Sequence, residues 1–208
     1  MKPFRGMSLF ALSLLLISGC ADKPTQNEPV ASQAKNTEKS TETPKAAVPE
    51  NEVKLAESLK TLGAKLKQDQ AGYVIEVDFR GTKIDDAALK EIAGLSHLRS
   101  LLLNETPITD AAFESVGKVT TLENLDLRNC SLNNKAISYL TGLSKLKALR
   151  LSGNSDIDDD AMADINQLTN LKALMLDFLW VSGDGLSQLK DLNKLEELYL
   201  AKTLVDDD

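Results

Sequence analysis

Five copies of one pattern, Leu-x-x-Leu-x-Leu, decide the fold: LRSLLL at 98–103, LENLDL at 122–127, LKALRL at 146–151, LKALML at 171–176 and LEELYL at 195–200. Successive copies begin 24, 24, 25 and 24 residues apart, and VIEVDF at 74–79 fits the same register one period earlier. A fixed period of this length is typical of a solenoid, in which each repeat buries its apolar face against its neighbours. The pattern therefore predicts six repeats, the last of them incomplete.

Each repeat shows the same sequence of strand, turn and helix signals. The alternating aliphatic run predicts a short strand, because strand side chains point to opposite faces in turn. A good helix N-cap follows each strand after a few residues. These positions are Asp85, Thr109, Asn133, Asp158, Ser182 and Asp206. We therefore expect every complete repeat to consist of one strand and one short helix.

These equivalent positions of successive repeats resemble the leucine-rich-repeat family over residues 73–208. The sequence Ile108-Thr109-Asp110 resembles the Asp-rich bacterial subclass of that family. The resemblance implies an α/β solenoid shaped like a horseshoe, with a parallel concave sheet and short convex helices. It also implies hydrogen bonds to the turning backbone from one column of side chains. This column holds Thr82, Thr106, Cys130, Asn154, Leu179 and Thr203. Leu179 interrupts it, and Cys130 is expected to be buried and not disulfide-bonded.

The N-terminus has the features of a targeting signal. Lys2 and Arg5 precede an apolar stretch over 7–17 that is too short to span a bilayer as a helix, so residues 1–19 are predicted to be a signal peptide. Its end, Ile17-Ser18-Gly19-Cys20, resembles the lipobox of bacterial lipoproteins. That resemblance implies lipidation of Cys20 and an anchor in the bacterial envelope, with the outer membrane favoured over the inner. An ordinary secretory leader is the alternative.

The segments that flank the repeats are expected to differ from them. Residues 20–52 are polar and almost free of large apolar side chains, which predicts a disordered tether. Residues 53–71 are predicted to form a cap helix with a leucine face, followed by the repeats over 72–208. The chain stops at Asp206-Asp207-Asp208, where a sixth helix should begin. The expectation is an open apolar end, which reflects either truncation or a surface that a partner covers.

The composition argues against most chemistry. The net charge of −7 lies entirely after residue 52 and disfavours nucleic acid as a partner. The chain has one His and two Cys, and no serine or cysteine is expected near a plausible base, so we expect no enzyme, cofactor or metal site. The acidic run Asp156, Asp158, Asp159 and Asp160 is better explained by helix capping and one inserted residue than by a calcium loop.

A binding surface is the function that remains. The central concave row changes from charged to apolar along the array, ending in Met175 and Tyr199. Such residues are typical of binding patches. The predicted partner-binding patch is Arg150, Met175, Phe178, Trp180 and Tyr199. Alternatively, the two loop aromatics, Phe178 and Trp180, fill a remodelled loop or shield the open end.

The leading prediction is therefore a non-enzymatic module that binds a protein or peptide and is held to the membrane by its N-terminal lipid. The first alternative is a structural envelope protein, including a homodimer formed through the C-terminal end. The second is a calcium-dependent adhesin.

Overall fold

The leucine pattern forms one sheet. The computed structural model describes residues 48–206, and within this range seven strands pair in the order of the chain. They are β1 (Lys65–Gln68), β2 (Val74–Asp78), β3 (Ser100–Leu102), β4 (Asn124–Asp126), β5 (Ala148–Arg150), β6 (Ala173–Met175) and β7 (Glu197–Tyr199). From β2 onward all strands run parallel, and Leu101, Leu125 and Leu149 pair in one row. The predicted parallel sheet is confirmed. The predicted signal peptide and Cys20 lie outside the described residues.

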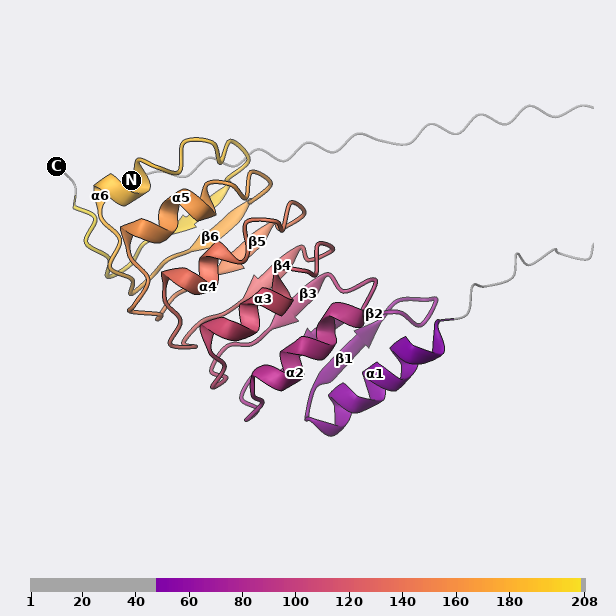
Figure 1. The fold of residues 1–208 in the computed structure, drawn as a ribbon. Helices are drawn as coiled ribbons and strands as arrows, with labels where there is room; N and C mark the ends of the chain where they lie inside the picture. Colours follow the sequence, from indigo (N-terminus) through magenta and orange to yellow (C-terminus); the bar gives the residue numbers. More distant parts are fainter. Residues whose placement is uncertain (1–47, 207–208) are drawn as a thin grey trace, which may run out of the picture. The chain divides into compact units, whose positions relative to one another are not determined.

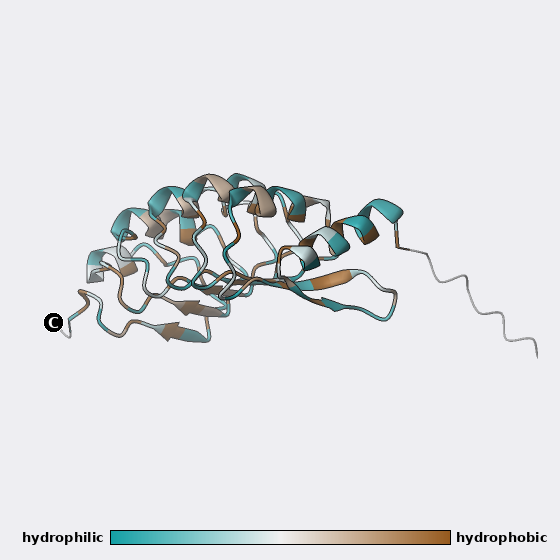
Figure 2. Cartoon of the chain, turned by 90° about the horizontal axis from the view of Figure 1, so that it is seen from below, coloured by the Kyte–Doolittle hydropathy of each residue, from teal (hydrophilic) through white to brown (hydrophobic). Residues whose placement is uncertain are grey.

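Short helices cover one face of this sheet, as Figures 1 and 2 show. The α-helices are α1 (Glu50–Thr61), α2 (Asp86–Glu91), α3 (Phe113–Val116), α4 (Asn134–Ser138), α5 (Met162–Ile165) and α6 (Gly183–Leu186). Short 3-10 turns extend three of the repeats: η1 (Ile92–Gly94), η2 (Asp110–Ala112) and η3 (Asp159–Ala161). No helix within 48–206 has both the length and the apolar character needed to cross a membrane.

The core lies between the sheet and the helices. Leu101, Leu125 and Leu149, the central leucines of three successive strands, are all fully buried. The first and last leucines of the same patterns are buried with them, as are the apolar residues of the helices. Because every repeat contributes the same positions, the core is a continuous aliphatic column. Fully burying each such side chain contributes about 1.5–3 kcal/mol.

The one 25-residue repeat keeps the sheet in register. Arg150 pairs with Met175, 25 residues on, whereas Asp126 pairs with Arg150, 24 residues on. The added residue lies in the loop between β5 and η3. There Asp156 forms a bridge with Asn133, and Asp158 forms one with Trp180. The loop therefore accommodates the extra residue, because its side chains do not alternate between the two faces of the sheet as those of a strand do.

The amino-terminal cap differs from the prediction. The helix predicted over 53–71 ends at Thr61, and Gly63 turns the chain at a φ of 94°. The next residues form β1, which pairs antiparallel with β2, Lys65 opposite Asp78. A strand satisfies the backbone groups at the edge of β2, which a helix cannot do. The prediction of one continuous cap helix was wrong, although a cap does cover this edge.

The boundary of the predicted tether was also wrong. Helix α1 begins at Glu50, inside the range 20–52, and Glu52 is only 2% exposed. The Glu52 carboxylate accepts hydrogen bonds from the backbone amide of Ser96 at 3.1 Å and from its hydroxyl at 3.0 Å. These bonds tie the start of α1 to the turn before β3. The polar composition of this segment concealed a specific contact.

The helix caps follow two patterns. Asp85, Asn133 and Asp158 accept hydrogen bonds from backbone amides in their own helices, as predicted. Thr109 and Ser182 form no such side-chain cap. Instead, the hydroxyl and backbone amide of Ser182 donate to the Asp159 carboxylate of the preceding repeat, at 2.6 and 2.8 Å. Thr109 and Ser182 therefore occupy the predicted N-cap positions, but their side chains link one repeat to the preceding one instead of bonding to their own helices.

Candidate functional site

The strands place one row of side chains along the middle of the sheet face that carries no helices, which we call the open face (Figure 2). Its register follows the strand pairs, so neighbouring members lie about 4.8 Å apart. The row consists of Asp78, Leu102, Asp126, Arg150, Met175 and Tyr199. As predicted for the concave face, the row ends in Met175 and Tyr199.

In the first half of the row the charged groups satisfy one another. The Arg80 guanidinium donates to both carboxylate oxygens of Asp78, at 2.9 and 2.8 Å. Arg128 holds Asp126 in the same two-pronged way, at 2.9 and 2.7 Å. The hydrogen bonds from Arg80 hold the pKa of Asp78 below its usual value, against the opposing effect of burial. The lowered pKa keeps the Asp78 carboxylate ionised near neutral pH, and both carboxylates are already engaged by an arginine.

The second half of the row carries larger and less polar side chains. Arg150 donates to the side-chain oxygen of Asn124 and is half-buried. Met175 is half-buried and pairs in register with both Arg150 and Tyr199. Tyr199 is 44% exposed, and the neighbouring Leu198 is 41% exposed. The structure thus brings together three of the five predicted patch residues.

The other two predicted residues lie in the loop after β6. Phe178 and Trp180 are 61% and 59% exposed, and Leu179 between them is buried. The Phe178 backbone amide donates to the Ala201 carbonyl, whereas that of Trp180 donates to the Ile157 carbonyl on the way to the helices. The two aromatic residues are therefore attached to different parts of the neighbouring repeats, and neither belongs to the open-face row.

Phe178 occupies a turn position that recurs in every repeat. The residue two positions after the last strand aliphatic has a positive φ throughout: Gly81, Glu105, Asn129, Gly153, Phe178 and Lys202. Glycine fills this position twice because it adopts such a φ without steric cost. The φ of Phe178 is 61°, which strains the backbone of a bulky residue. Its side chain is largely exposed and is not part of the core.

The predicted column of turn-bonding side chains is confirmed. Asn154 is fully buried, and its amide group makes four hydrogen bonds. Its oxygen accepts from the backbone amides of Cys130 and Leu132, at 3.0 and 3.1 Å, and its nitrogen donates to the carbonyls of Leu127 and Leu151, at 2.9 and 2.6 Å. Leu179 replaces these bonds with a buried aliphatic side chain, as its identity predicted.

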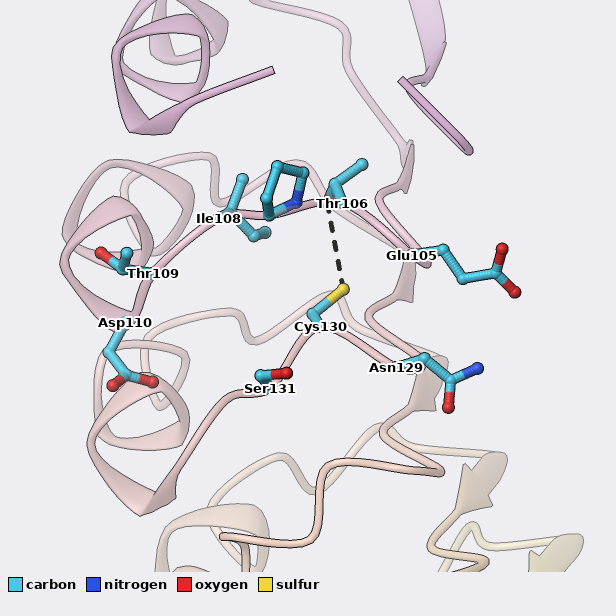
Figure 3. A pocket seen from close by; sticks show the side chains of 9 residues that line it. Glu105, Thr106, Ile108, Thr109, Asp110, Asn129, Cys130 and Ser131 are labelled. Atoms are coloured by element: carbon cyan, nitrogen blue, oxygen red, sulfur yellow. Dashed lines mark hydrogen bonds between the residues drawn. The ribbon is translucent and has the colours of Figure 1, made fainter. Parts of the chain in front are cut away.

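A pocket of about 620 Å³ opens between two of these turns (Figure 3). Its walls are residues 105–110 of one repeat and residues 129–131 of the next. The Cys130 thiol is 3.1 Å from the Leu103 carbonyl and 4.0 Å from the Thr106 hydroxyl. Burial raises the pKa of this thiol, which disfavours the reactive thiolate. Cys130 thus has the predicted role of a buried structural residue.

One contact contradicts the expectation that no serine lies near a base. The Ser96 hydroxyl is 2.7 Å from Nδ1 of His97. However, the same hydroxyl donates to Glu52 at 3.0 Å, so the carboxylate contacts the serine and not the imidazole. In a catalytic triad the acid orients the histidine, which then accepts the serine proton. This arrangement instead fixes the turn, where the His97 ring also lies 3.8 Å from that of Tyr73.

The acidic run near Asp158 is engaged in structural bonds. Asp158 caps its own 3-10 turn and accepts from the side-chain nitrogen of Asn134 at 2.6 Å. Asp159 binds Ser182, as described above. Between residues 48 and 206, no group of three or more His, Cys, Asp or Glu residues could hold a metal ion. The interpretation of this run as helix capping is therefore confirmed for Asp158.

Sequence reasoning missed one column of residues, which lies three positions before the strands. Its members are His97, Thr121, Lys145, Asn170 and Lys194. In the structure they line cavities together with a second column of charged residues. The signal was available in the repeat alignment, because residues 24 or 25 positions apart become neighbours when the strands stack.

Comparison with known proteins identifies the fold and no closer relationship. No protein-family model and no curated protein sequence match the chain. The receptor kinase HAESA of Arabidopsis, solved with the peptide hormone IDA and the co-receptor SERK1, is similar, with a TM-score of 0.55 and 20% identity over 76% of this chain. The chain spans only 30% of that structure.

Two further similar structures are shorter. The leucine-rich-repeat ectodomain of Arabidopsis SOBIR1 gives a TM-score of 0.45 and 18% identity, over 76% of this chain and 98% of its own. Internalin C2 of Listeria monocytogenes gives 0.44 and 16%, over 74% and 85%. The parallel register, the buried leucine rows and the likeness to HAESA together establish that this chain folds as a leucine-rich-repeat solenoid.

Proposed function

We propose that the chain is a non-enzymatic module that binds a protein or peptide through the second half of its open face. The observation that carries this proposal is the contrast along one row of side chains. Asp78 and Asp126 are each held by a neighbouring arginine, whereas Tyr199 is 44% exposed and pairs in register with Met175. A shared fold does not transfer function, so the proposal rests on these side chains.

The chemistry of this region suits a polypeptide ligand. Tyrosine buries a large area at low conformational cost, and arginine, tyrosine and tryptophan are enriched among the residues that dominate binding energy. Arg150, Met175 and Tyr199 offer a guanidinium, a flexible thioether and an aromatic ring within three adjacent strands. Phe178, one loop away, extends the apolar surface toward the next repeat.

A random peptide library displayed on phage and selected against the full chain tests this function. Selected peptides should bind the Met175→Ala/Tyr199→Ala variant at least about tenfold more weakly, a loss of about 1.4 kcal/mol. Leu102→Ala is the matched control, because Leu102 is an apolar residue of the same row outside the proposed patch. A Phe178→Asn/Trp180→Ser variant reports separately on the loop. Equal affinity for the patch variant and the wild type, or a selection that yields no specific peptide, would refute the proposal.

We further propose that lipidation of Cys20 anchors the module in a bacterial envelope. Supporting this is the order of a basic start, an apolar run over 7–17 and Ile17-Ser18-Gly19-Cys20. One acyl chain gives only marginal membrane binding, whereas several chains together anchor a protein stably. Radiolabelled palmitate should label the chain in bacteria and should not label Cys20→Ala. Membrane fractionation that left both proteins in the soluble fraction would argue against the anchor.

A second candidate function, self-association, rests on the exposed side chains around β7. Leu198 is 41% exposed and Leu204 is 53% exposed, which leaves apolar surface next to the strand. If two copies pair here, sedimentation of the full chain should show a dimer at micromolar concentration that Leu198→Asp/Leu204→Asp abolishes. A monomer at every concentration would remove this candidate.

A further inference from the structure

The beginnings of the strands form a regular edge with its own charge pattern. Each residue just before a strand donates its backbone amide to the carbonyl one repeat earlier, at 2.7 to 2.9 Å. The residues linked in this way are Arg99, Glu123, Lys147, Lys172 and Glu196. A second column lies two residues earlier in each repeat: His97, Thr121, Lys145, Asn170 and Lys194. Both columns therefore advance by one strand spacing, about 4.8 Å, per repeat.

Two adjoining cavities run along this edge, and we call them together the strand-start groove. One, of about 390 Å³, is lined by Ser96, His97, Arg99, Thr121, Glu123 and Lys145. The other, of about 320 Å³, is lined by Glu123, Ser144, Lys145, Lys147, Asn170, Lys172 and Lys194. Glu123 and Lys145 line both, which makes the groove continuous. Five cationic side chains therefore face one lining carboxylate, in a chain whose net charge is −7.

Internal ion pairs leave part of this positive charge available. Lys147 pairs with Glu123 at 2.6 Å, and Lys172 pairs with Glu196 at 2.6 Å. Arg99 and Lys145 have no carboxylate within 4.0 Å among residues 48–206, and the Lys194 ammonium donates to the side-chain oxygen of Asn170.

The pKa of Glu123 reflects the positive electrostatic potential in the groove. The hydrogen bond from Lys147 lowers the pKa of Glu123, and the charges of Arg99 and Lys145 lower it further. A second anion placed in the groove would experience the same two cations without having to displace an existing ion pair.

Two of the three available cations lie in one column at a defined spacing. Lys145 and Lys194 lie three residues before β5 and β7, so they are two strand spacings apart, about 9–10 Å, whereas Arg99 lies in the other column, immediately before β3. An extended glycan advances by a similar length for every two sugars. We propose that the strand-start groove binds an acidic glycan that carries one anionic group on every second sugar.

The remaining lining residues favour a glycan over a polypeptide. Ser96, Thr121, Ser144 and Asn170 offer hydroxyl and amide groups for sugar hydroxyls, and no aliphatic residue lines either cavity. Peptide ligands draw their affinity mainly from apolar and aromatic anchors, whereas the apolar surface of this groove comes only from the carbon atoms of polar and charged residues. Single-stranded nucleic acid needs several aromatic platforms for its bases, whereas the one aromatic ring here, His97, lies against Tyr73.

Titration calorimetry on the full chain tests the groove with a hyaluronan octasaccharide, which has one carboxylate per disaccharide. A chitin oligosaccharide of equal length is the neutral probe. We expect binding to hyaluronan alone, with an affinity that falls between about 0.01 M and 0.15 M ionic strength as the charges are screened. Because the groove does not include the open face, this result is independent of the peptide selection.

The Lys145→Gln/Lys194→Gln variant should bind hyaluronan about tenfold more weakly, as expected when two exposed charge contacts are lost. Lys135→Gln/Lys190→Gln is the matched control, because it removes the same charge from exposed lysines outside the groove and should stay within about twofold of wild type. All four lysines are exposed, so unchanged thermal unfolding should confirm that both variants fold.

Three results would overturn the proposal. The first is an equal loss in the two lysine variants, which would indicate net charge and not a site. The second is no binding of hyaluronan, or equal binding of the neutral chitin probe. The third is tighter binding of a peptide with glutamate at every third residue, whose charges have the same spacing, because the groove would then be a site for acidic peptides.

Discussion

The Asp86 carboxylate accepts two hydrogen bonds from Thr109 of the next repeat, from the backbone amide at 2.8 Å and from the hydroxyl at 2.5 Å. Asp110 binds Asn133 in the same way, and Asp159 binds Ser182. These bonds connect the starts of successive helices, where backbone amides have no partner within the helix. The helix side of the solenoid is thus held together by side-chain bonds as well as by its core.

Replacing Asp86 with alanine should therefore lower the free energy of unfolding by about 1 kcal/mol, because one charge-assisted contact between repeats is lost. Asp184→Ala is the control. It also removes an acidic residue from a first helical turn, but its carboxylate has no hydrogen bond within residues 48–206. Urea denaturation measures both. Equal losses in the two variants would mean that the helix dipole, and not the link between repeats, is responsible.

Asn154→Ala should be far more damaging. It leaves two backbone amides and two carbonyls without their side-chain partner in a fully buried turn. Each unsatisfied buried group costs about 1–3 kcal/mol, so we expect a loss of at least about 3 kcal/mol. Asn51→Ala, at an exposed helical position, should change stability by less than about 0.5 kcal/mol. A small effect at Asn154 would show that water replaces its amide.

Phe178→Gly should stabilise the fold by about 1 kcal/mol, because glycine removes the cost of a left-handed backbone at φ 61°. The reverse change at the equivalent position, Gly153→Ala, should destabilise it. A Cβ atom at Gly153 would lie 2.0 Å from the side-chain oxygen of Asn129, at a φ of 81°. Thermal unfolding of the two variants gives the comparison. If Phe178→Gly is less stable than the wild type, the aromatic ring contributes packing that outweighs the strain.

Acid should destabilise the protein partly through Asp78. Arg80 holds the pKa of Asp78 below its usual 3.8, so on acidification the unfolded chain takes up the proton first. This contribution to stability is present above the unfolded pKa and is lost as the pH falls through the lower folded value. Between about pH 5 and pH 3, Asp78→Asn should lose less stability than the wild type. Parallel curves of stability against pH for the two proteins would show that the Arg80 contact does not contribute to stability.

The thiol of Cys130 should be unreactive in the native protein, because it is 3% exposed and burial raises its pKa. In the Cys20→Ala variant, Ellman's reagent should detect no rapidly reacting thiol before denaturation and one thiol after it. Rapid labelling of the native variant would instead show that the turn around Cys130 opens readily.

The repeat fold could be predicted because its signals are periodic and mutually consistent. The rows through Leu101 and Met175 follow from the spacing of identical patterns, and the pairing confirms them. Features that occur once carried no such support. The strand at Lys65–Gln68 depends on a glycine turn and on the open edge of β2, and the burial of Glu52 depends on Ser96, 44 residues away. Neither contact has a periodic counterpart in the sequence.

The candidate sites likewise differ in how far they could be predicted from the sequence. The open-face row could be placed from alternation alone, because a strand fixes the direction of each side chain. Phe178 and Trp180 could not be placed, since a loop with a positive φ does not alternate in this way. The strand-start groove was missed for a different reason. Its cations are scattered in the sequence, and only stacking brings Lys145 and Lys194 to one cavity.

The loop that accommodates the additional residue near Asp156 has a consequence for how such chains change length. Arg150 and Met175 remain aligned although their repeat is one residue longer than its neighbours. Single-residue insertions or deletions in this connecting segment should leave the spacing of ligand-contacting side chains intact. The same change within a strand would exchange inward and outward positions. Diversification by small indels is therefore compatible with a fixed binding geometry only on the helix side of each repeat.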